Sequence, residues 1–392
     1  MEPKTSKKVN AKKQKILFIT HASSNLNYGA ARSLGLLLRN ISYPFDIMFP
    51  IIPISRNIIS RSYLKEYCGS SVQNIFFNIL LPFNYNAIFG EKYHRTSNDS
   101  ILKEYIKKYA YTLSKFFLRN IIRIGKYKYI HLNSLGFSDL IDKNQNYIIH
   151  VREVFSGSNI EFENVSRHLS LAKLVIFIDH STYLPFREIN MNYVILENPF
   201  DMRYVQEIKT EDLISKYNID TNKVIVSILG VIDPIKGVDF VIDAYNHAKN
   251  ENLILLVVGR YENKNYYENC INIANNNPNI IFTGDLKNPG EIFKISDYIL
   301  RGDDIFCIGR TVNEGLYSGC NAIIPYSPDS EVNLSIFDEK YHEKIKLYIA
   351  RDLNSLADVL NKCTKVNQES REYVSNLEEY VTKFKAVTGL CK

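Results

Sequence analysis

Short apolar runs alternate with segments of helical period along this 392-residue chain, and this alternation most constrains its fold. The runs are uniformly apolar, as strands are when a parallel sheet buries them on both faces. They lie at residues 15–20, 129–132, 147–151, 174–179, 193–196, 224–230, 253–259, 279–282, 298–300, 322–325 and 347–350. Strands that alternate with helices form α/β folds with right-handed crossovers. The sequence therefore predicts an α/β protein with doubly wound parallel sheets.

A polar stretch around residues 198–222 divides this alternation into two blocks, as expected for a chain of this length. In doubly wound folds, ligands bind outside the carboxyl ends of the strands, so we expect the two domains to face one cleft. We predict a basic flexible tail over 1–13, an N-terminal Rossmann-like domain over 14–198, a C-terminal one over 199–367, and a closing helix over 368–392.

Composition argues against several classes of protein. The net charge of +6 is modest for this length, so nucleic acid is not an expected partner. The six cysteines form no CxxC pair and no cluster with zinc spacing. No uninterrupted apolar stretch reaches the roughly 18 residues of a membrane span, and the lysine-rich start is not followed by the apolar region of a signal peptide. We expect a cytoplasmic protein, either free or peripheral at the inner face of the membrane.

The segment "SILGVIDPIKGVDFVIDAYNHA" (227–248) holds a lysine at the start of a helix. Gly230 ends a predicted strand, and Lys236 precedes a helix predicted to begin near Val238. A helix N-terminus offers unpaired N–H groups and about half a positive charge, to which the lysine adds a full charge, and this suits a phosphate. The glycine spacing is not that of a Walker motif. On these residues alone, a solvated surface lysine remains an alternative.

A second candidate site lies in "IGRTVNEGLYSGCNAIIP" (308–325). Glu314 stands in a short helical stretch after a turn at Gly309 and Arg310. A carboxylate near a helix start can accept hydrogen bonds from both hydroxyls of a sugar diol. The same glutamate also fits a simple favourable charge at a helix start, and both interpretations stay open.

These segments resemble the donor-binding domain of family 4 retaining glycosyltransferases. The similar stretches, in order, are "GVIDPIKGVDFVIDA", "LLVVGRY", "NIIFTGDLKNPGEIFKISDYIL" and "GRTVNEGLYSGCNAIIP". In the first half, "KILFITHASSNLNYGAARSLGLLLRNI", "YIHLNSLG" and "YIIHVREVF" resemble the acceptor domain. The resemblance covers most of residues 15–365 and is patchy between 45 and 125. It implies the GT-B fold, with a nucleotide-sugar in the C-terminal domain and an acceptor in the N-terminal one.

The resemblance also implies roles for individual residues. The lysine that binds the donor phosphate falls on Lys236, and the glutamate that binds the ribose falls on Glu314. The histidine at a strand end of the acceptor domain falls on His150, although a strand-end histidine is also a common satisfied polar residue. We predict Lys236, Glu314 and His150 as catalytic residues, and Gly29, Ala30, Gly230, Lys236, Gly309, Arg310, Thr311 and Glu314 as donor-binding residues.

The chain departs from the family pattern at three places. Val231 stands where the family usually has an arginine after the strand-ending glycine, and Phe306 replaces the first glutamate of the E-x7-E pair. The glycine loop reads Tyr28-Gly29-Ala30-Ala31 in place of glycine-glycine-alanine-glutamate. Arg310 and Arg301 are the candidates to supply the missing positive charge.

The predicted reaction transfers a sugar, with retention, from a nucleotide-diphosphate donor to a glycan acceptor, expected to be lipid-linked and part of a cell-surface polysaccharide. No cofactor is expected, and no metal, because the adjacent pair Asp303-Asp304 lies where the family has no metal site. The alternative is a catalytically silent relative that binds a nucleotide or a glycan, as Val231 and Phe306 suggest.

A predicted helix at 102–123 carries lysines and arginines on its polar side, near the apolar segment 76–89. Basic amphipathic helices lie on anionic membrane surfaces, which would suit a lipid-linked acceptor. The alternative is a helix packed on the N-terminal sheet with its basic face in water.

Overall fold

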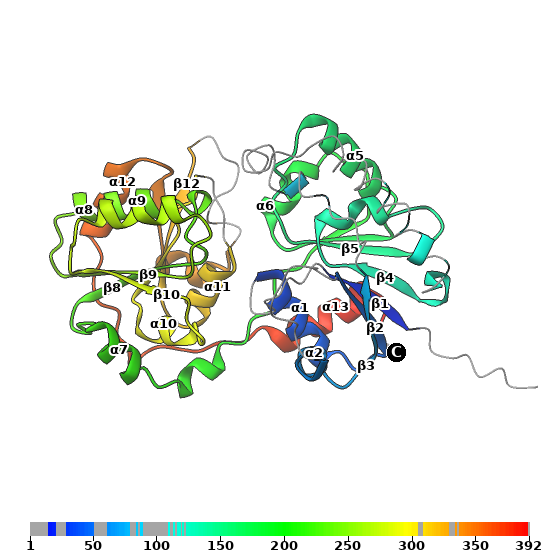
Figure 1. Cartoon of the computed structure of the whole chain (residues 1–392), viewed down its shortest axis with the longest axis horizontal. Helices are drawn as coiled ribbons and strands as arrows, with labels where there is room; N and C mark the ends of the chain where they lie inside the picture. Colours follow the sequence, from blue (N-terminus) through cyan, green and yellow to red (C-terminus); the bar gives the residue numbers. More distant parts are fainter. Residues whose placement is uncertain are drawn as a thin grey trace, which may run out of the picture. The chain divides into compact units, whose positions relative to one another are not determined.

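The computed structural model describes residues 15–20, 29–50, 61–78, 123–304, 309–328 and 337–390, with isolated positions at 84, 87, 88, 109, 113, 116–118, 120 and 334. The chain divides into two compact units, which Figure 1 colours along the sequence. Unit 1 comprises residues 1–197 and 380–392, and unit 2 comprises residues 198–379. The chain therefore returns to unit 1 at its C-terminal end.

Unit 1 is built on a seven-stranded parallel sheet with strand order β3-β2-β1-β4-β5-β6-β7. The strands are β1 (Ile16–Ile19), β2 (Phe45–Pro50), β3 (Val72–Asn78), β4 (Tyr129–Leu132), β5 (Tyr147–Val151), β6 (Leu174–Phe177) and β7 (Tyr193–Ile195). The sequence did not predict β2 and β3. A buried aspartate, Asp46, interrupts the apolar run of β2, where it accepts hydrogen bonds from Asn74 and Tyr127 at 2.8 Å each. β3 lies at the sheet edge and exposes part of its length.

The helices of unit 1 bury apolar side chains, except for the four-residue helix at 180–183, whose buried residues are Ser181 and Thr182. They are α1 (Gly29–Asn40), α2 (Arg61–Cys68), α5 (Asn159–Leu169), α6 (His180–Tyr183) and α13 (Leu377–Val387), with short 3-10 turns at Ile124–Lys126, Leu135–Leu140 and Leu184–Phe186. In α1, Leu34, Leu37 and Leu38 are fully buried at helical spacing. The predicted closing helix at 368–392 is the shorter α13, whose residues from Tyr380 onward belong to unit 1. Most of the predicted helix at 102–123 lies outside the described residues.

Unit 2 is built on a six-stranded parallel sheet with strand order β10-β9-β8-β11-β12-β13. The strands are β8 (Val224–Leu229), β9 (Leu253–Val258), β10 (Ile280–Gly284), β11 (Tyr298–Leu300), β12 (Asn321–Tyr326) and β13 (Ile345–Ile349). The helices are α7 (Glu211–Tyr217), α8 (Val238–His247), α9 (Lys264–Ala274), α10 (Gly290–Ile295), α11 (Gly309–Tyr317) and α12 (Leu353–Asn361), with short 3-10 turns at Arg203–Glu207, Pro234–Lys236 and Glu339–Lys344.

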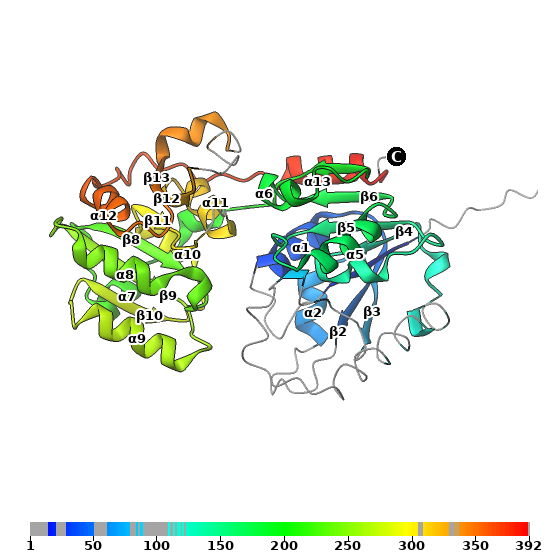
Figure 2. The same cartoon turned by 90° about the horizontal axis from the view of Figure 1, so that it is seen from above.

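Two hydrophobic cores sandwich this second sheet. Along β8, Val224 and Val226 join the core under α8, α9 and α12, while Ile225 joins the core of α7 and α10 on the opposite face. Figure 1 shows these helix layers on the two sides of the sheet, and Figure 2 shows the layer of α8, α9 and α12 from above. Each run predicted from the sequence overlaps a strand of the structure, and the α/β doubly wound fold class is confirmed.

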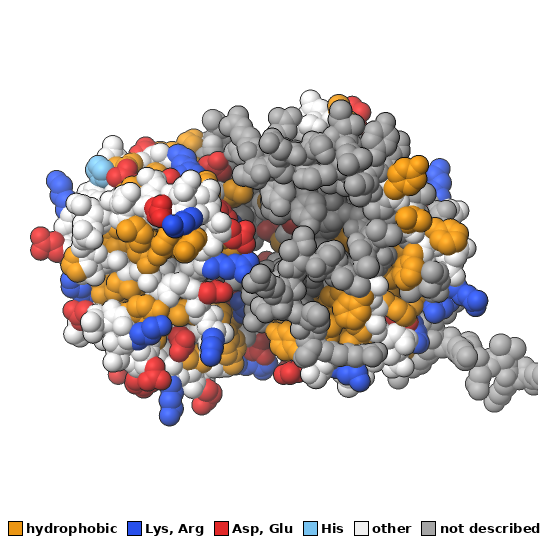
Figure 3. Space-filling view, in the orientation of Figure 1, with side chains coloured by type: hydrophobic (Ala, Val, Ile, Leu, Met, Phe, Trp, Pro, Cys, Tyr) orange, Lys and Arg blue, Asp and Glu red, His pale blue; other side chains and the backbone are white. Residues whose placement is uncertain are grey.

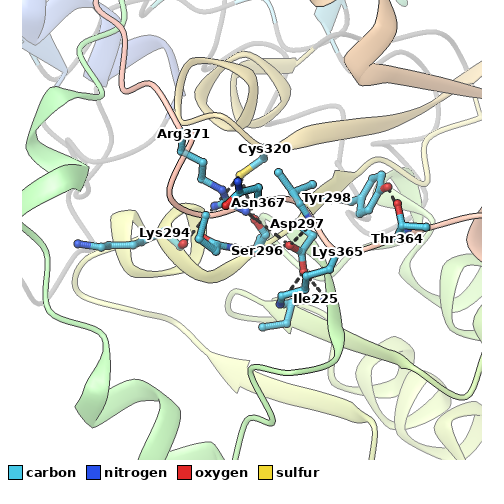
Figure 4. A network of polar contacts seen from close by, with 12 residues as sticks. Ile225, Lys294, Ser296, Asp297, Tyr298, Cys320, Thr364, Lys365, Asn367 and Arg371 are labelled. Atoms are coloured by element: carbon cyan, nitrogen blue, oxygen red, sulfur yellow. Dashed lines mark hydrogen bonds and ion pairs between the residues drawn. The ribbon is translucent and has the colours of Figure 1, made fainter.

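A buried aspartate fixes the segment that leaves unit 2. The Asp297 carboxylate, fully buried, accepts from the backbone N–H of Ile225 at 2.8 Å, from the N–H of Val366 at 3.0 Å and from Lys365 Nζ at 3.0 Å. Arg371 in the same segment donates to the carbonyl oxygens of residues 293, 294 and 296 (Figure 4). The stretch 365–371 is therefore bound to the sheet although it has no helix or strand.

Candidate functional site

The topological switch point of unit 2 lies between β8 and β11. β9, the next strand along the chain, pairs with one edge of β8, and β11 pairs with the opposite edge of β8. Ligands of open α/β sheets bind outside the carboxyl ends of the strands at such a point. The loops that follow Leu229 of β8 and Leu300 of β11 therefore form the candidate site.

The loop after β8 holds Lys236 at the predicted position, directly before α8. Asp233 caps one 3-10 turn, Pro234–Lys236, by accepting from the Lys236 N–H at 3.0 Å. Gly237 follows with φ +60, a conformation that side chains disfavour. A methyl group at Gly237 would overlap the carbonyl oxygen of Gly302, so the two loops of the site touch through their backbones.

The loop after β11 supplies the partners of this lysine. Asp303 receives two hydrogen bonds from Arg301, Nε to Oδ2 at 2.7 Å and Nη2 to Oδ1 at 2.9 Å, and Lys236 Nζ lies 3.4 Å from Oδ1. Burial by itself raises the pKa of the Asp303 carboxyl, but the charges and hydrogen bonds of Arg301 and Lys236 outweigh it and hold the pKa below its ordinary value. Asp303 is therefore ionised and bound to two cations.

The first turn of helix α11 contacts Arg301, which pairs with Asp303. The Arg301 guanidinium lies under its first turn, with Nη1 3.5 Å from Thr311 Oγ1 and in the space that a side chain at Gly309 would occupy. One turn along the helix, Arg310 Nε donates to Glu314 Oε1 at 2.8 Å. The Glu314 carboxylate is 1% exposed.

The Arg310 side chain contacts other residues of unit 2. Besides Glu314, it donates to the carbonyl oxygen of Pro199 at 3.1 Å, and its guanidinium carbon lies 4.6 Å from the centre of the Phe200 ring. These contacts tie the start of unit 2 to α11. Of the two arginines named as candidates for the missing charge, Arg301 is the one joined to Lys236 through a shared carboxylate.

Within unit 2, the structure connects Lys236, Gly309 and Thr311 through Arg301 and Asp303, and it places Arg310 and Glu314 on the same helix α11. Gly230 follows β8 with φ +141 and has open space where a side chain would stand. Val231 is half-buried. Phe306 and Tyr28 lie outside the described residues.

Gly29, Ala30 and His150 belong to unit 1. α1 begins at Gly29, and the Ala30 carbonyl oxygen accepts a hydrogen bond from Asn133 at 3.5 Å. The His150 imidazole is fully buried, with its ring centre 5.6 Å from that of His131 and its Nδ1 3.2 Å from Arg152 Nη2. Burial and then the Arg152 charge lower the pKa of His150 well below its ordinary value. The structure therefore places His150 inside the fold and not on an open face.

Charge and metal-ligand chemistry bear on what the site can bind. Blue and red side chains are interspersed on the face of unit 2 seen in Figure 3. In the part of the chain that the structure describes, no three His, Cys, Asp or Glu side chains gather as metal ligands, and no helix is long and apolar enough to cross a membrane. The Lys236 side chain is 30% exposed, and its ammonium can donate hydrogen bonds to an anion.

The fold recurs in solved structures, among them two of glycosyltransferases. The HepE protein of Anabaena, solved with UDP and glucose, shares 15% identity at a TM-score of 0.65, with 94% of this chain and 95% of that chain covered. A glycosyltransferase of Rickettsia africae shares 14% identity at a TM-score of 0.67, with 97% of this chain and 98% of that chain covered. WaaG, a glycosyltransferase involved in lipopolysaccharide biosynthesis, shares 12% identity at a TM-score of 0.59, with 88% of this chain and 90% of that chain covered. No curated protein matches the chain.

Two parallel α/β units that match these structures over nearly their whole length define a protein of the GT-B fold, as predicted. Residues 209–323 match the family described as glycosyl transferases group 1. This segment holds Lys236, Asp303 and most of α11, so the candidate site lies in the part of unit 2 that matches that family model.

Sequence reasoning did not pair Asp303 with Lys236, although it noted both residues. The available signal was the sequence Arg301-Gly302-Asp303 directly after a buried strand, because opposite charges two residues apart at a strand end can pair. That Lys236 would join this pair depends on the adjacency of β8 and β11, which the local sequence does not reveal.

Proposed function

We propose that the protein is a retaining glycosyltransferase whose nucleoside-diphosphate sugar binds at the carboxyl edge of the second sheet. The observation that carries this proposal is Lys236, a partly exposed cation at the β8/β11 switch point, within the segment that matches group 1 glycosyl transferases. HepE, of the same fold, was solved with UDP and glucose, which supports a nucleotide-sugar as the donor.

In the proposed mechanism, Lys236 stabilises the negative charge that develops on the leaving diphosphate. The bond between the sugar C1 and the phosphate oxygen breaks while the acceptor hydroxyl attacks from the face that the leaving group vacates. The hydroxyl proton passes to the departing phosphate oxygen, so no protein nucleophile and no metal ion is needed. We propose that Glu314, held by Arg310, binds the ribose, and that Gly230, Gly309 and Thr311 line the donor site in unit 2. For Gly29 and Ala30, in unit 1, donor binding is proposed from the family resemblance alone.

We propose a lipid-linked glycan as the acceptor, in cell-surface polysaccharide synthesis at the cytoplasmic side of a membrane. The lipopolysaccharide role of the structural relative WaaG supports this class of acceptor. Tyr109, Leu113 and Phe116 of the segment 102–123 are 72%, 53% and 61% exposed, so apolar side chains are available there to an anionic membrane surface. His150 keeps a place in this proposal only through the acceptor-domain resemblance, since it is buried.

The test is a thermal-shift screen with UDP, GDP, ADP, TDP and CMP, followed by calorimetry with the nucleotide that binds. Lys236→Ala should lower diphosphate affinity and reduce transfer about 10²–10³-fold, while affinity for the nucleoside alone stays unchanged. Lys264→Ala is the matched control, because this lysine is 75% exposed on α9 in the same unit. Unchanged diphosphate binding in Lys236→Ala would refute the placement of the donor site.

A catalytically silent relative is the second candidate, favoured by Val231 in the place of a phosphate-binding arginine. It predicts the same nucleotide binding and the same loss in Lys236→Ala. It differs in predicting no release of nucleoside diphosphate from any donor sugar, with or without a glycan acceptor.

A further inference from the structure

We propose that Asp303 is a positioning residue for the transfer reaction: fixed by Arg301, it holds the Lys236 ammonium where the leaving diphosphate develops charge. This inference rests on the proposed function and adds residues that the motif around Lys236 does not contain. Asp303 and Arg301 come from the loop after β11, whereas Lys236 comes from the loop after β8.

The exposed fractions of the three side chains show that Arg301 and Asp303 are buried and that Lys236 lies at the surface. Arg301 is 7% exposed, Asp303 5% and Lys236 30%. The two inner groups therefore form a buried ion pair, and only the lysine at its outer end reaches solvent. A bound anion can contact Lys236 without displacing the inner pair.

The inner pair is held rigidly. Arg301 binds both carboxylate oxygens of Asp303, and a bidentate arginine–carboxylate pair fixes orientation as well as distance. The Arg301 carbonyl oxygen accepts from the buried Tyr348 hydroxyl at 2.6 Å, which fixes the end of β11. The close approach of Gly237 to Gly302 then sets the spacing between the two loops.

The shared oxygen explains why this rigidity matters for Lys236. Oδ1 of Asp303 lies 2.9 Å from Arg301 Nη2 and 3.4 Å from Lys236 Nζ, so the lysine is oriented by an acceptor that cannot itself move freely. A lysine side chain has four rotatable bonds, and a preset orientation removes the need to reorganise it during the reaction. With Val231 in place of an arginine, the placement of Lys236 carries more of the phosphate stabilisation.

Charge predicts how binding and turnover separate. The Asp303 carboxylate cancels the charge of Arg301, so the three groups together carry a net charge of about +1. Asp303→Asn removes the negative charge without removing a cation. Diphosphate affinity should therefore stay equal or rise by up to about 10-fold at low salt, while turnover falls because Lys236 loses its orientation.

The experiment measures UDP, GDP, ADP and TDP affinity by calorimetry, and kcat as nucleoside diphosphate released from the corresponding donor sugars. Asp303→Asn should lower kcat about 10–100-fold with diphosphate affinity retained or increased, and Asp303→Glu should restore part of kcat. The matched control is Asp338→Asn, which breaks an exposed pair with Lys340 in the same unit and should leave both quantities unchanged.

A variant that replaces both Arg301 and Asp303 keeps the inference testable if Asp303→Asn fails to fold. Arg301→Met with Asp303→Leu removes the buried pair together and leaves no uncompensated buried charge. This double variant should also keep diphosphate affinity and lose turnover. Wild-type kcat in either a folded Asp303→Asn or the double variant overturns the inference, as does a parallel loss of diphosphate and nucleoside binding. If Lys236→Ala has no effect on diphosphate affinity, the proposed function itself is at fault, so the two failures are distinguishable.

Discussion

Gly237→Ala tests whether the backbone contact between the two loops of the site is needed for both stability and function. Gly237 has φ +60, and its missing side chain leaves room for the carbonyl oxygen of Gly302. An alanine at this position meets two separate obstacles, the left-handed backbone conformation and an overlap with main-chain atoms, which cannot rotate away as a side chain can.

The magnitude follows from these two terms. The left-handed conformation costs a non-glycine residue about 1–2 kcal/mol. Forcing an extra carbon into a packed contact typically costs a further 1–3 kcal/mol, because the Gly237 and Gly302 loops must separate. The same separation changes the distance between Lys236 and Asp303, and a misplacement of about 1 Å can reduce turnover about 10²-fold.

Gly284→Ala provides the matched control. Gly284 has φ +68 in the same unit, but nothing lies within 4 Å of the position where its side-chain carbon would stand. This variant should lose only the conformational term, about 1–2 kcal/mol, with donor affinity and turnover unchanged. Urea unfolding gives the free energies of unfolding of both variants, and calorimetry with release of nucleoside diphosphate gives their function.

Gly237→Ala should be less stable than Gly284→Ala by about 1–3 kcal/mol, and it alone should lose turnover. Equal unfolding free energies for the two variants would show that the Gly302 contact does not constrain the loop. A Gly237→Ala variant that is destabilised but fully active would separate the packing of the loops from the placement of Lys236.

Two further predictions concern stability. Asp297→Ala should cost about 3–5 kcal/mol of unfolding free energy, since Lys365 and two backbone N–H groups lose their acceptor; the exposed Asp338→Ala is the control, and an equal effect of both would contradict the argument. In unit 1, burial and then the Arg152 charge lower the pKa of His131 to about 3. Because the histidine of the unfolded chain has a pKa of about 6.5, the contribution of neutral His131 to stability is complete above that pH and is lost as the pH falls toward 3. His131→Phe, which suits a ring between Phe18 and Phe384, should lose less stability on acidification than the wild type, and an unchanged pH dependence of the melting temperature would refute this.

Much of the fold could be predicted because its strands are locally encoded. Uniformly apolar runs such as Val224–Leu229 have few soluble alternatives to a strand covered on both faces. β2 escaped prediction because Asp46 interrupts its apolar run. Its partners Lys15, Asn74 and Tyr127, from distant parts of the chain, make that buried charge acceptable. Polar residues of this kind are not interpretable before their partners are known.

The candidate site was predictable to the extent that one short segment defines it. Gly230, Lys236 and the start of α8 follow one another closely, and the structure has them as the local pattern indicated. His150 shows the opposite case. Its position at a strand end favoured a ligand, but its ring stacks on His131, which in turn stacks on Phe384 of α13 at 5.6 Å. A helix more than two hundred residues later in the chain decides that environment.

The α/β class, the two blocks of parallel strands and the lysine at a helix start follow from local sequence, because periodicity, burial and turn chemistry act over a few neighbouring residues. Tertiary structure alone decided what that lysine touches. Lys236 and Asp303 are 67 positions apart and meet because β8 and β11 are adjacent in the sheet. Strand order depends on the packing of the whole unit, and the interactions that orient a charged side chain follow from that order.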